Sequence, residues 1–437
     1  MAQATPGGRG GIAVVRLSGE GAKAVGKMIC GSLPEAWSLK PCSFSRCGGE
    51  VIDSGLVIFF AGPRSYTGED VVELHCHGNP LIVDALVSSA VSFGARVAEP
   101  GEFTKRAFLN NKIDLAQAEA VSDLISAKTE TSLRGANASF SGDFSKAINT
   151  SIDRLIGLRV SVEASLDFPD EEDVGGGSEN VNKDLLSGIE REVSFMESLL
   201  SSSRSSQVLR KGAKIVIVGP PNCGKSTLLN FFASEDVAIT SNSPGTTRDA
   251  VRASVDFGGV PVELVDTAGI RFDGVGLVEG EGIRRASEET KGADLVLIMS
   301  VVGEDFSFEL DRGVSFLRVY NKVDLCDLSG PGFVGDGVFV SALTGYGIDV
   351  LVEKVCSEMG VGLGVETPFL VRRRHLSFLG SAKEGLVRAV GVLESGGGFE
   401  VAAEELRAAQ FALGQITRPL SSDDLLGEIF SSFCIGK

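Results

Sequence analysis

A glycine-rich segment, GPPNCGKS at residues 219–226, is the first candidate for chemistry in this chain. It follows the apolar run KIVIV and precedes TLLNFF, a strand–loop–helix context in which backbone N–H groups and a helix N-terminus surround phosphate groups. Lys225 is then expected to reach the β- and γ-phosphates. The Ser226 hydroxyl is expected to coordinate Mg²⁺, which prefers oxygen ligands. The segment therefore predicts a nucleoside triphosphate site with bound magnesium.

Two later motifs predict that the base is guanine. NKVD at 321–324 follows the strand-like run FLRVY. The Asp324 carboxylate can accept hydrogen bonds from both the ring N–H and the exocyclic amine of guanine, which adenine cannot supply in that geometry. SAL at 341–343 would complete the base pocket with a backbone N–H. Together the motifs indicate a GTP site.

Two further motifs lie between the glycine-rich segment and NKVD. DTAG at 266–269 ends an apolar run; its aspartate would orient magnesium through water, and the Gly269 N–H could sense the γ-phosphate. GTTRD at 245–249 offers Thr247 as a second magnesium ligand on a switching loop. The residues predicted to contact GTP are Asn222, Cys223, Gly224, Lys225, Ser226, Thr227, Ser241, Gly245, Thr246, Thr247, Asp266, Thr267, Ala268, Gly269, Asn321, Lys322, Asp324, Ser341 and Ala342.

The usual catalytic glutamine is missing. Ile270 follows DTAG at the position where many GTPases place a glutamine that orients the attacking water. One replacement is Glu279 in VEGEGIRR, with Glu281 as a rival and a solvated surface acid as the plain alternative. The other is Asn222, whose side-chain oxygen could hold K⁺ against the phosphates and so supply positive charge. Both stay open on the residues alone.

Composition limits the possible classes. The chain has 437 residues, 43% of them hydrophobic, which suits two to four globular domains. Its net charge of −17 argues against a protein that coats nucleic acid, so any such contact must be local or shared with a partner. Eight cysteines without CxxC spacing and only three histidines make zinc an unexpected ligand. With no signal peptide and no membrane-length apolar run, we expect a cytoplasmic protein with reduced thiols and no membrane partner.

The pattern of apolar residues changes three times along the chain. Residues 1 to about 112 mix short β-rich runs with one helix-like stretch, Pro80 to Phe93, as in an α+β domain. Residues 115 to about 209 have helical spacing. From Lys214, β-branched runs alternate with helical stretches, which is typical of a mostly parallel α/β sheet. Helices return after about Gly362. We therefore expect a multidomain α/β protein whose P-loop domain is inserted between two helical halves that pack together.

Several longer strings are not dictated by any general fold constraint. They are ATPGGRGGIAVVRLSG, SYTGEDVVELHCHG, ARVAEPGEFTKRAFLNNKIDLAQAEAVSDLI and the terminal CIGK. Through these strings and the GTPase motifs, essentially the whole chain resembles the bacterial and organellar tRNA modification GTPases of the MnmE (TrmE) family. The resemblance implies a tetrahydrofolate-binding and dimerisation domain, one discontinuous helical domain and a Ras-like GTPase domain. The implied boundaries are 1–114 for the N-terminal domain, 115–211 and 362–437 for the helical parts, and 212–361 for the GTPase domain.

The resemblance also implies an activity and partners. The family works as a homodimer with the flavoprotein MnmG, which carries FAD, in a heterotetramer. Together they add an aminomethyl or carboxymethylaminomethyl group to carbon 5 of the wobble uridine of certain tRNAs. The carbon comes from a tetrahydrofolate derivative, in the 5,10-methylene or 5-formyl form. The GTPase domains pair when GTP and K⁺ bind, and hydrolysis follows, with Mg²⁺ as a further cofactor. Which tRNAs are read, and whether ammonia or glycine supplies nitrogen, stays open.

Site residues follow from the resemblance by motif position. The folate contacts would be Arg16, Glu73, Lys112 and Lys437, since cations suit the glutamate tail and a carboxylate suits the donor edge of the pterin. The K⁺ ligands would be Asn222, Ser241, Ser243 and Thr246. Glu279 would be the residue that activates water. A surface charge is the plain alternative for each folate residue taken alone.

The chain also departs from the family pattern. Cys223 stands in the P-loop where alanine is usual, and Gly7 where a second proline is usual. The first strand is expected to be shortened, so the N-terminus is open to question. One extra residue separates DTAG from VEGEGIRR, so the assignment of Glu279 depends on a one-residue gap.

Two remaining features have open readings. Cys434 in CIGK is either a functional thiol or, as we prefer, a packing residue, since no histidine adjoins it. The basic run of Arg372, Arg373, Arg374 and His375 either binds tRNA phosphate or is a solvated helix start. A GTP-switched assembly factor competes with the modification enzyme, but would need neither the one-carbon strings nor CIGK. A folate aminomethyltransferase with a decayed GTPase conflicts with the intact GTP motifs.

Overall fold

The computed structural model describes residues 1–167, 178–234, 251–266, 288–304, 306–311, 313–326, 333–334, 337–362, 369–395, 398–418, 423–431 and 433–436. These residues divide into two compact units. The first consists of residues 1–122, 145–149 and 414–437, and the second of residues 123–144 and 150–413. Each unit is described separately below. None of the helices in the described ranges is long and apolar enough to cross a membrane.

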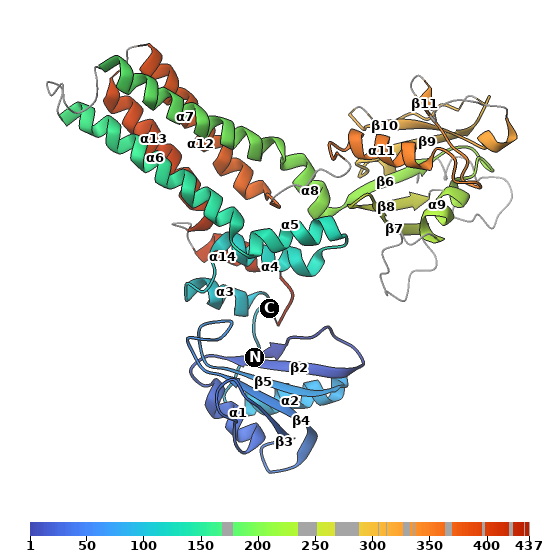
Figure 1. Ribbon diagram of the computed structural model, residues 1–437. Helices are drawn as coiled ribbons and strands as arrows, with labels where there is room; N and C mark the ends of the chain where they lie inside the picture. Colours follow the sequence, from blue (N-terminus) through green and yellow to red (C-terminus); the bar gives the residue numbers. More distant parts are fainter. Residues whose placement is uncertain are drawn as a thin grey trace. The chain divides into compact units, whose positions relative to one another are not determined.

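The first unit contains a five-stranded antiparallel sheet in the order β1-β2-β5-β4-β3. One sheet face packs against α1 and α2 through side chains such as Val15, Val57 and Leu74, all fully buried (Figure 1). Residues of the opposite face, which alternate with these, are half-exposed. The strands are β1 (Ala2–Gln3), β2 (Gly10–Ser18), β3 (Leu39–Ser45), β4 (Val51–Phe60) and β5 (Val71–Gly78).

Helices of the first unit differ from the expectation of a single helix before residue 112. Besides α2 (Pro80–Ser92), the structure has α1 (Ala22–Cys30) and α3 (Glu102–Leu109). Asn79 caps α2 through its side chain and Pro80 opens it, which are the start signals that a sequence can show. The helices α1 and α3 follow glycines and have no side-chain cap, so these signals are absent. The prediction of one helix was therefore wrong.

Long helices flank the P-loop segment on both sides in the chain. In the second unit α7 packs along α12, so the halves before and after the P-loop domain pack together as expected (Figure 1). Arg159 of α6 also donates to Gln410 of α13 at 2.8 Å. The helices are α4 (Leu115–Ser126), α5 (Glu130–Phe140), α6 (Asp143–Asp167), α7 (Ser178–Ser201), α8 (Ser203–Lys211), α12 (Arg373–Glu394), α13 (Phe399–Thr417) and α14 (Asp423–Ser431).

The second sheet has seven strands in the order β11-β12-β10-β9-β6-β8-β7. Five neighbouring strands are parallel, and only β7 and β11 at the edges are antiparallel to their neighbours in this described sheet. Near-continuous apolar runs such as LVLIMSV suit strands buried on both faces, which confirms the expected α/β class. The strands are β6 (Ala213–Val218), β7 (Val251–Phe257), β8 (Val260–Asp266), β9 (Leu295–Val301), β10 (Phe316–Asn321), β11 (Phe333–Val334) and β12 (Gly337–Phe339); α9 (Lys225–Ser234), η3 (Val323–Leu325) and α11 (Ile348–Glu358) accompany them.

Candidate functional site

The P-loop lies at the carboxyl end of β6, which pairs with β8 on one side and β9 on the other. Its two glycines lie so close to neighbouring atoms that a side chain would not fit at either position. A Cβ on Gly219 would overlap the Met299 carbonyl oxygen, and one on Gly224, whose φ is +101°, would overlap the side chain of Asn321. The strand, the loop and α9 therefore have the arrangement that the sequence predicted for phosphate binding.

Lys225 and Ser226 open α9 and turn toward the loop and the next strand. The Lys225 ammonium, buried with its residue 6% exposed, donates to the carbonyl oxygens of Gly219 and Pro220 at 2.8 Å each. The Ser226 hydroxyl donates to the Asp266 carboxylate at 2.7 Å. The two predicted magnesium-site oxygens thus lie side by side, beside a cation that the same loop holds in place.

Asn321 connects three of the predicted motifs. Its side-chain amide donates to the Cys223 carbonyl at 2.8 Å, and its side-chain oxygen accepts from the Ala342 N–H at 2.9 Å. Asn321 is 2% exposed, so both bonds are shielded from water. The residue therefore fixes the loop after β10 and the SAL segment to the P-loop.

Asp324 is held by the SAL segment. One of its carboxylate oxygens accepts from the Ser341 hydroxyl at 2.6 Å, while the residue itself is exposed. Ser341 is fully buried and also accepts from the Thr344 N–H at 3.2 Å. An oriented, solvent-facing carboxylate next to a fixed loop is what recognition of the guanine donor edge requires.

Cys223 lies inside the P-loop with its residue 1% exposed. Burial raises the pKa of the thiol, against the opposing influence of Lys225, whose ammonium is 3.9 Å from the sulfur. A protonated, buried thiol is a poor nucleophile. Cys223 therefore acts as a small packing residue in the P-loop.

Several predicted GTP-site residues lie outside the described part of the chain. This applies to the water-activating candidate Glu279 and its rival Glu281, and to the potassium ligands other than Asn222. Asn222 itself has a left-handed backbone, φ +61°, and is exposed. The predicted residues outside the described ranges are Ser241, Ser243, Gly245, Thr246, Thr247, Thr267, Ala268, Gly269, Glu279, Glu281 and Lys437.

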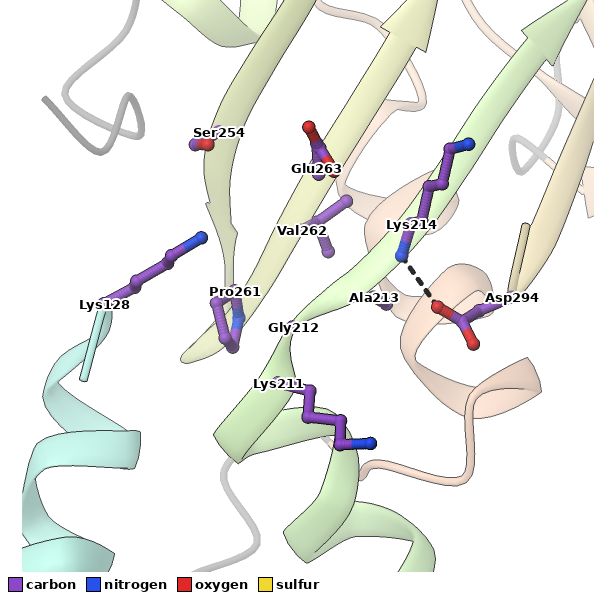
Figure 2. Close-up of a pocket in the computed structure, with 10 residues that line it drawn as sticks. All are labelled: Lys128, Lys211, Gly212, Ala213, Lys214, Ser254, Pro261, Val262, Glu263 and Asp294. Atoms are coloured by element: carbon purple, nitrogen blue, oxygen red, sulfur yellow. Dashed lines mark hydrogen bonds between the residues drawn. The ribbon is translucent and has the colours of Figure 1, made fainter. Parts of the chain in front are cut away.

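A cavity of about 120 Å³ lies at the other end of the same sheet (Figure 2). Its lining includes Lys211 and Ala213, at the start of β6, and Asp294, which accepts from the Lys214 N–H at 2.8 Å. Ligands of open α/β sheets bind at the carboxyl ends of the strands, and this cavity is at the amino ends. It is therefore separate from the nucleotide site.

A second group of predicted residues meets on the half-exposed face of the first sheet. Arg16 of β2 donates through Nε to Glu73 of β5 at 2.8 Å, across directly paired strand positions. The guanidinium also lies over the rings of Tyr66 and Phe103, 5.6 Å from each centroid. His75 places Nε2 3.3 Å from the other oxygen of Glu73. Arg16 is thus a paired and stacked cation in this structure, and its role as a folate contact stays a prediction.

Lys112 and the C-terminal motif lie near the same group. Lys112 donates to the Pro63 carbonyl at 2.9 Å and packs against Gly68, in the loop that carries Tyr66. The Gly101 N–H donates to the Cys434 carbonyl at 3.4 Å, and Gly436 lies against Gln3 of β1, the strand beside β2. The Cys434 thiol is exposed. CIGK therefore reaches the N-terminal strands, where the folate prediction needs it.

Arg372, the first residue of the basic run, fits neither of the two alternatives that the sequence left open, a tRNA phosphate contact or a solvated helix start. Arg372 is 14% exposed and donates to both oxygens of Asp123, at 2.6 and 3.2 Å. Arg210 lies 4.0 Å from the same carboxylate. Arg373 is exposed, whereas Arg374 lies 3.2 Å from His375. Arg372 is neither solvated nor available to tRNA phosphate, because a buried carboxylate binds it.

Comparison with known sequences finds similar proteins over nearly the whole chain. Residues 1–112 match the family described as GTP-binding protein TrmE N-terminus, and residues 115–434 match the MnmE helical domain. The chain belongs to the tRNA modification GTPase MnmE family. The Nitrosomonas eutropha member is 45% identical over 447 residues, covering 99% of this chain and 98% of the relative. The Legionella pneumophila (strain Corby) member is 43% identical, covering 100% and 99%.

Among solved structures, a variant of Aquifex aeolicus Era bound to GDP·AlF₄⁻ is similar to part of the chain. It is 25% identical, covers 40% of this chain and 66% of its own, and has a TM-score of 0.27. Membership of the MnmE family rests on the full-length sequence matches instead.

Sequence reasoning missed three residues at the folate candidate site. Tyr66, Phe103 and His75 stand in the strings SYTGED, GEFTKRAF and ELHCHG, which carried the resemblance to the MnmE family. Their side chains surround Arg16 and Glu73. Alternation along β5 could have placed His75 on the face of Glu73, but stacking between distant segments has no sequence signal.

Proposed function

We propose that this chain hydrolyses GTP as part of the modification of wobble uridine in certain tRNAs, together with the flavoprotein MnmG. The product would carry an aminomethyl or carboxymethylaminomethyl group at carbon 5. A tetrahydrofolate derivative would supply the carbon, and the nitrogen donor would be ammonia or glycine. The chain would act as a homodimer in a heterotetramer with MnmG.

One observation supports the GTPase part most directly. The Asn321 side chain binds both the P-loop carbonyl of Cys223 and the N–H of Ala342. It therefore holds the P-loop, NKVD and SAL motifs together. Asp324, oriented by Ser341, would then select guanine by accepting from its two donors. Lys225 would leave the P-loop carbonyls to bind the β- and γ-phosphates.

The described residues fit a magnesium ion. Ser226 and Asp266 bring a hydroxyl and a carboxylate oxygen within 2.7 Å of each other, both of the hard type that Mg²⁺ selects. When bound, the ion would neutralise charge on the β- and γ-phosphates. The Ser226 hydroxyl would then coordinate it directly, with Thr247 as the second ligand. Asp266 would act through water, so the present hydrogen bond between Ser226 and Asp266 would open.

Potassium would supply the positive charge at the phosphates that an arginine side chain supplies in other GTPases. We assign Asn222, Ser241, Ser243 and Thr246 as its ligands. The described residue of this set, Asn222, is exposed at the edge of the P-loop and has no side-chain hydrogen bond within the described ranges, so its amide oxygen is free to bind a cation. Glu279 would orient the attacking water, with Glu281 as the rival. The second subunit's GTPase domain would close the site.

The folate part of the proposal rests on the first sheet. Glu73 presents a carboxylate that is already anchored, which suits the donor edge of a pterin. Lys112 is an exposed cation suited to the glutamate tail, and Lys437 follows Gly436, which lies against Gln3. Bound folate would carry the one-carbon unit; the chain's own residues would position it and exclude water.

The first experiment measures GTP turnover in KCl and in NaCl, each at about 100 mM. The equal ionic strength makes the screening of charges the same in the two salts. We expect turnover to rise at least about tenfold in potassium, because one well-placed charge at the transferring phosphate contributes that much or more. The variant Asn222→Ala should lose the difference. Equal rates in both salts would refute the cation mechanism but leave GTP binding intact.

The second experiment tests the tRNA function. Mass spectrometry of wobble uridines from cells lacking the gene should show loss of the carbon-5 group, restored by the wild-type gene and not by Lys225→Ala. Unchanged uridines in the deletion strain would favour the competing reading of a GTP-switched assembly factor.

A further inference from the structure

We propose that His75 is a positioning residue for the folate site, which holds the Glu73 carboxylate in the orientation needed to accept hydrogen bonds from the ligand. This inference rests on the proposed folate function and adds a residue to it. The observations that carry it are the contacts of Glu73, the place of His75 on the sheet, and a neighbouring histidine that lacks those contacts.

Glu73 is anchored through both oxygens. Oε1 accepts from Arg16 Nε at 2.8 Å, and Oε2 lies 3.3 Å from His75 Nε2. An ionised carboxylate only accepts hydrogen bonds, so the imidazole must carry its hydrogen on Nε2 to make this contact. A carboxylate has about four lone-pair positions, and two are used here. Two remain, one on each oxygen, for donors of a ligand.

A single anchor would not fix this carboxylate. The terminal torsion of glutamate is broad, so a bond to one oxygen leaves the plane of the group free to turn. The rings of Tyr66 and Phe103 restrict the positions open to Arg16, whose guanidinium lies over both. His75 supplies the second point and thereby defines the plane. The pair Arg16 and His75 therefore aims the acceptor edge of Glu73 in one direction.

The sheet explains why His75 can do this without closing the site. Positions 73 and 75 of β5 share the half-exposed face, and the side chains of Arg16, Glu73 and His75 are 22%, 15% and 25% exposed. Val14 and Leu56 are the strand partners of His75 on either side. An apolar side chain at position 75 would have apolar neighbours, so the fold should tolerate leucine there.

His77 provides a matched control two residues further along β5. Its Nδ1 lies 2.8 Å from Asp53, its side chain is 70% exposed, and it makes no contact with Glu73 among the described residues. His75 and His77 thus both lie on β5, and each is paired with a carboxylate. Only His75 is paired with the predicted folate ligand.

The experiment is calorimetric binding of 5-formyltetrahydrofolate to the full chain. The variants are His75→Leu, His75→Gln, Glu73→Gln, the double variant of Glu73→Gln with His75→Leu, and the control His77→Leu. We expect His75→Leu to weaken binding about tenfold, because one hydrogen bond to a charged group no longer orients the acceptor. His75→Gln keeps an N–H donor and should stay within about twofold of wild type, as should His77→Leu.

The double variant distinguishes positioning from direct contact. If His75 acts through Glu73, His75→Leu should cost no more than about twofold once Glu73 is glutamine, because interacting residues are not additive. Full additivity, or wild-type affinity for His75→Leu, would overturn the inference while leaving the folate site in place. No saturable binding by the wild type would instead overturn the proposed folate function, and this inference with it. Thermal unfolding of each variant confirms that the fold is intact.

Discussion

The substitution Asp324→Asn should change the base that this protein selects. In the structure one Asp324 oxygen is held by Ser341 at 2.6 Å, and the residue faces solvent. Guanine offers two donors to this carboxylate. An asparagine in the same place keeps its oxygen toward Ser341 and one guanine donor, and sets its NH₂ group against the exocyclic amine. One charge-assisted bond is lost and a donor faces a donor.

The expected magnitude follows from the bonds involved. A hydrogen bond to a charged group contributes about 1.5–3 kcal/mol, so the loss of one such bond and the new mismatch should weaken GTP binding by roughly 100-fold. Xanthine carries a carbonyl oxygen where guanine carries the amine, and this oxygen can accept from the new NH₂ group. XTP binding should therefore improve while GTP binding falls.

The assay is a fluorescence titration with labelled GTP and XTP. Asp349→Asn is the matched control, since this exposed aspartate lies in the first turn of α11 and changes the same charge. The control should bind both nucleotides as the wild type does. If Asp324→Asn keeps GTP affinity within about threefold, or shows no gain for XTP, then Asp324 does not read the base and the guanine assignment loses its physical basis.

Two further predictions concern stability. Arg372→Ala removes the hydrogen bonds of 2.6 and 3.2 Å to the Asp123 carboxylate, which is 6% exposed, and should destabilise the second unit by about 3–5 kcal/mol. Arg388→Ala removes an ion pair whose guanidinium lies in solvent and should lower the unfolding midpoint far less; equal unfolding midpoints of the two variants in a thermal melt would contradict this. Burial alone would raise the pKa of Glu102, but hydrogen bonds from Arg96, the Glu99 amide and Arg106 lower it from 4.5 to about 2. Because its folded pKa is depressed, Glu102 contributes stability above its unfolded pKa, and the first unit should lose that stability as pH falls from about 5 toward 2. Glu102→Gln should flatten the melting temperature over that range, and an unflattened profile would show that other carboxylates dominate.

The nucleotide site could be predicted because it is built from local signals. The P-loop, DTAG, NKVD and SAL motifs each follow a strand of the sheet, and parallel strands bring their carboxyl ends to one edge of the sheet. The order of motifs was therefore enough to place Ser226 beside Asp266 and Ser341 beside Asp324, as the structure has them. Sequence alone could not supply the role of Asn321, which depends on the distance between two loops.

The first unit was less predictable because its interactions join distant segments. Arg16 and Glu73 pair across 57 positions, and the register between β2 and β5 that aligns them has no sequence signature. The helices α1 and α3 lack side-chain caps and so gave no start signal. The resemblance predicted Arg16 and Glu73 as folate contacts, but it did not predict that the two side chains pair with each other.

Asp123 lies at the junction between the P-loop sheet and its flanking helices, a role that the composition did not predict. The chain enters the sheet through α8 and returns from it into α12, and Asp123 binds Arg372 at the return while lying 4.0 Å from Arg210 at the entry. Ser206 of α8 donates to the Phe369 carbonyl at 3.2 Å, and Thr129, which caps α5, donates to Gly259 at 2.8 Å.

Both crossings are therefore joined to the helices by part-buried hydrogen bonds, and Leu370 packs on Gly135 within the same apolar core as the sheet. A slide of the sheet against these helices would uncover the Asp123 carboxylate, at a cost of several kcal/mol. A movement of the P-loop sheet during the GTP cycle would consequently carry α5, α8 and the start of α12 with it. We therefore expect Arg372→Ala to change the amount of tRNA modified per GTP hydrolysed more than it changes the affinity for GTP.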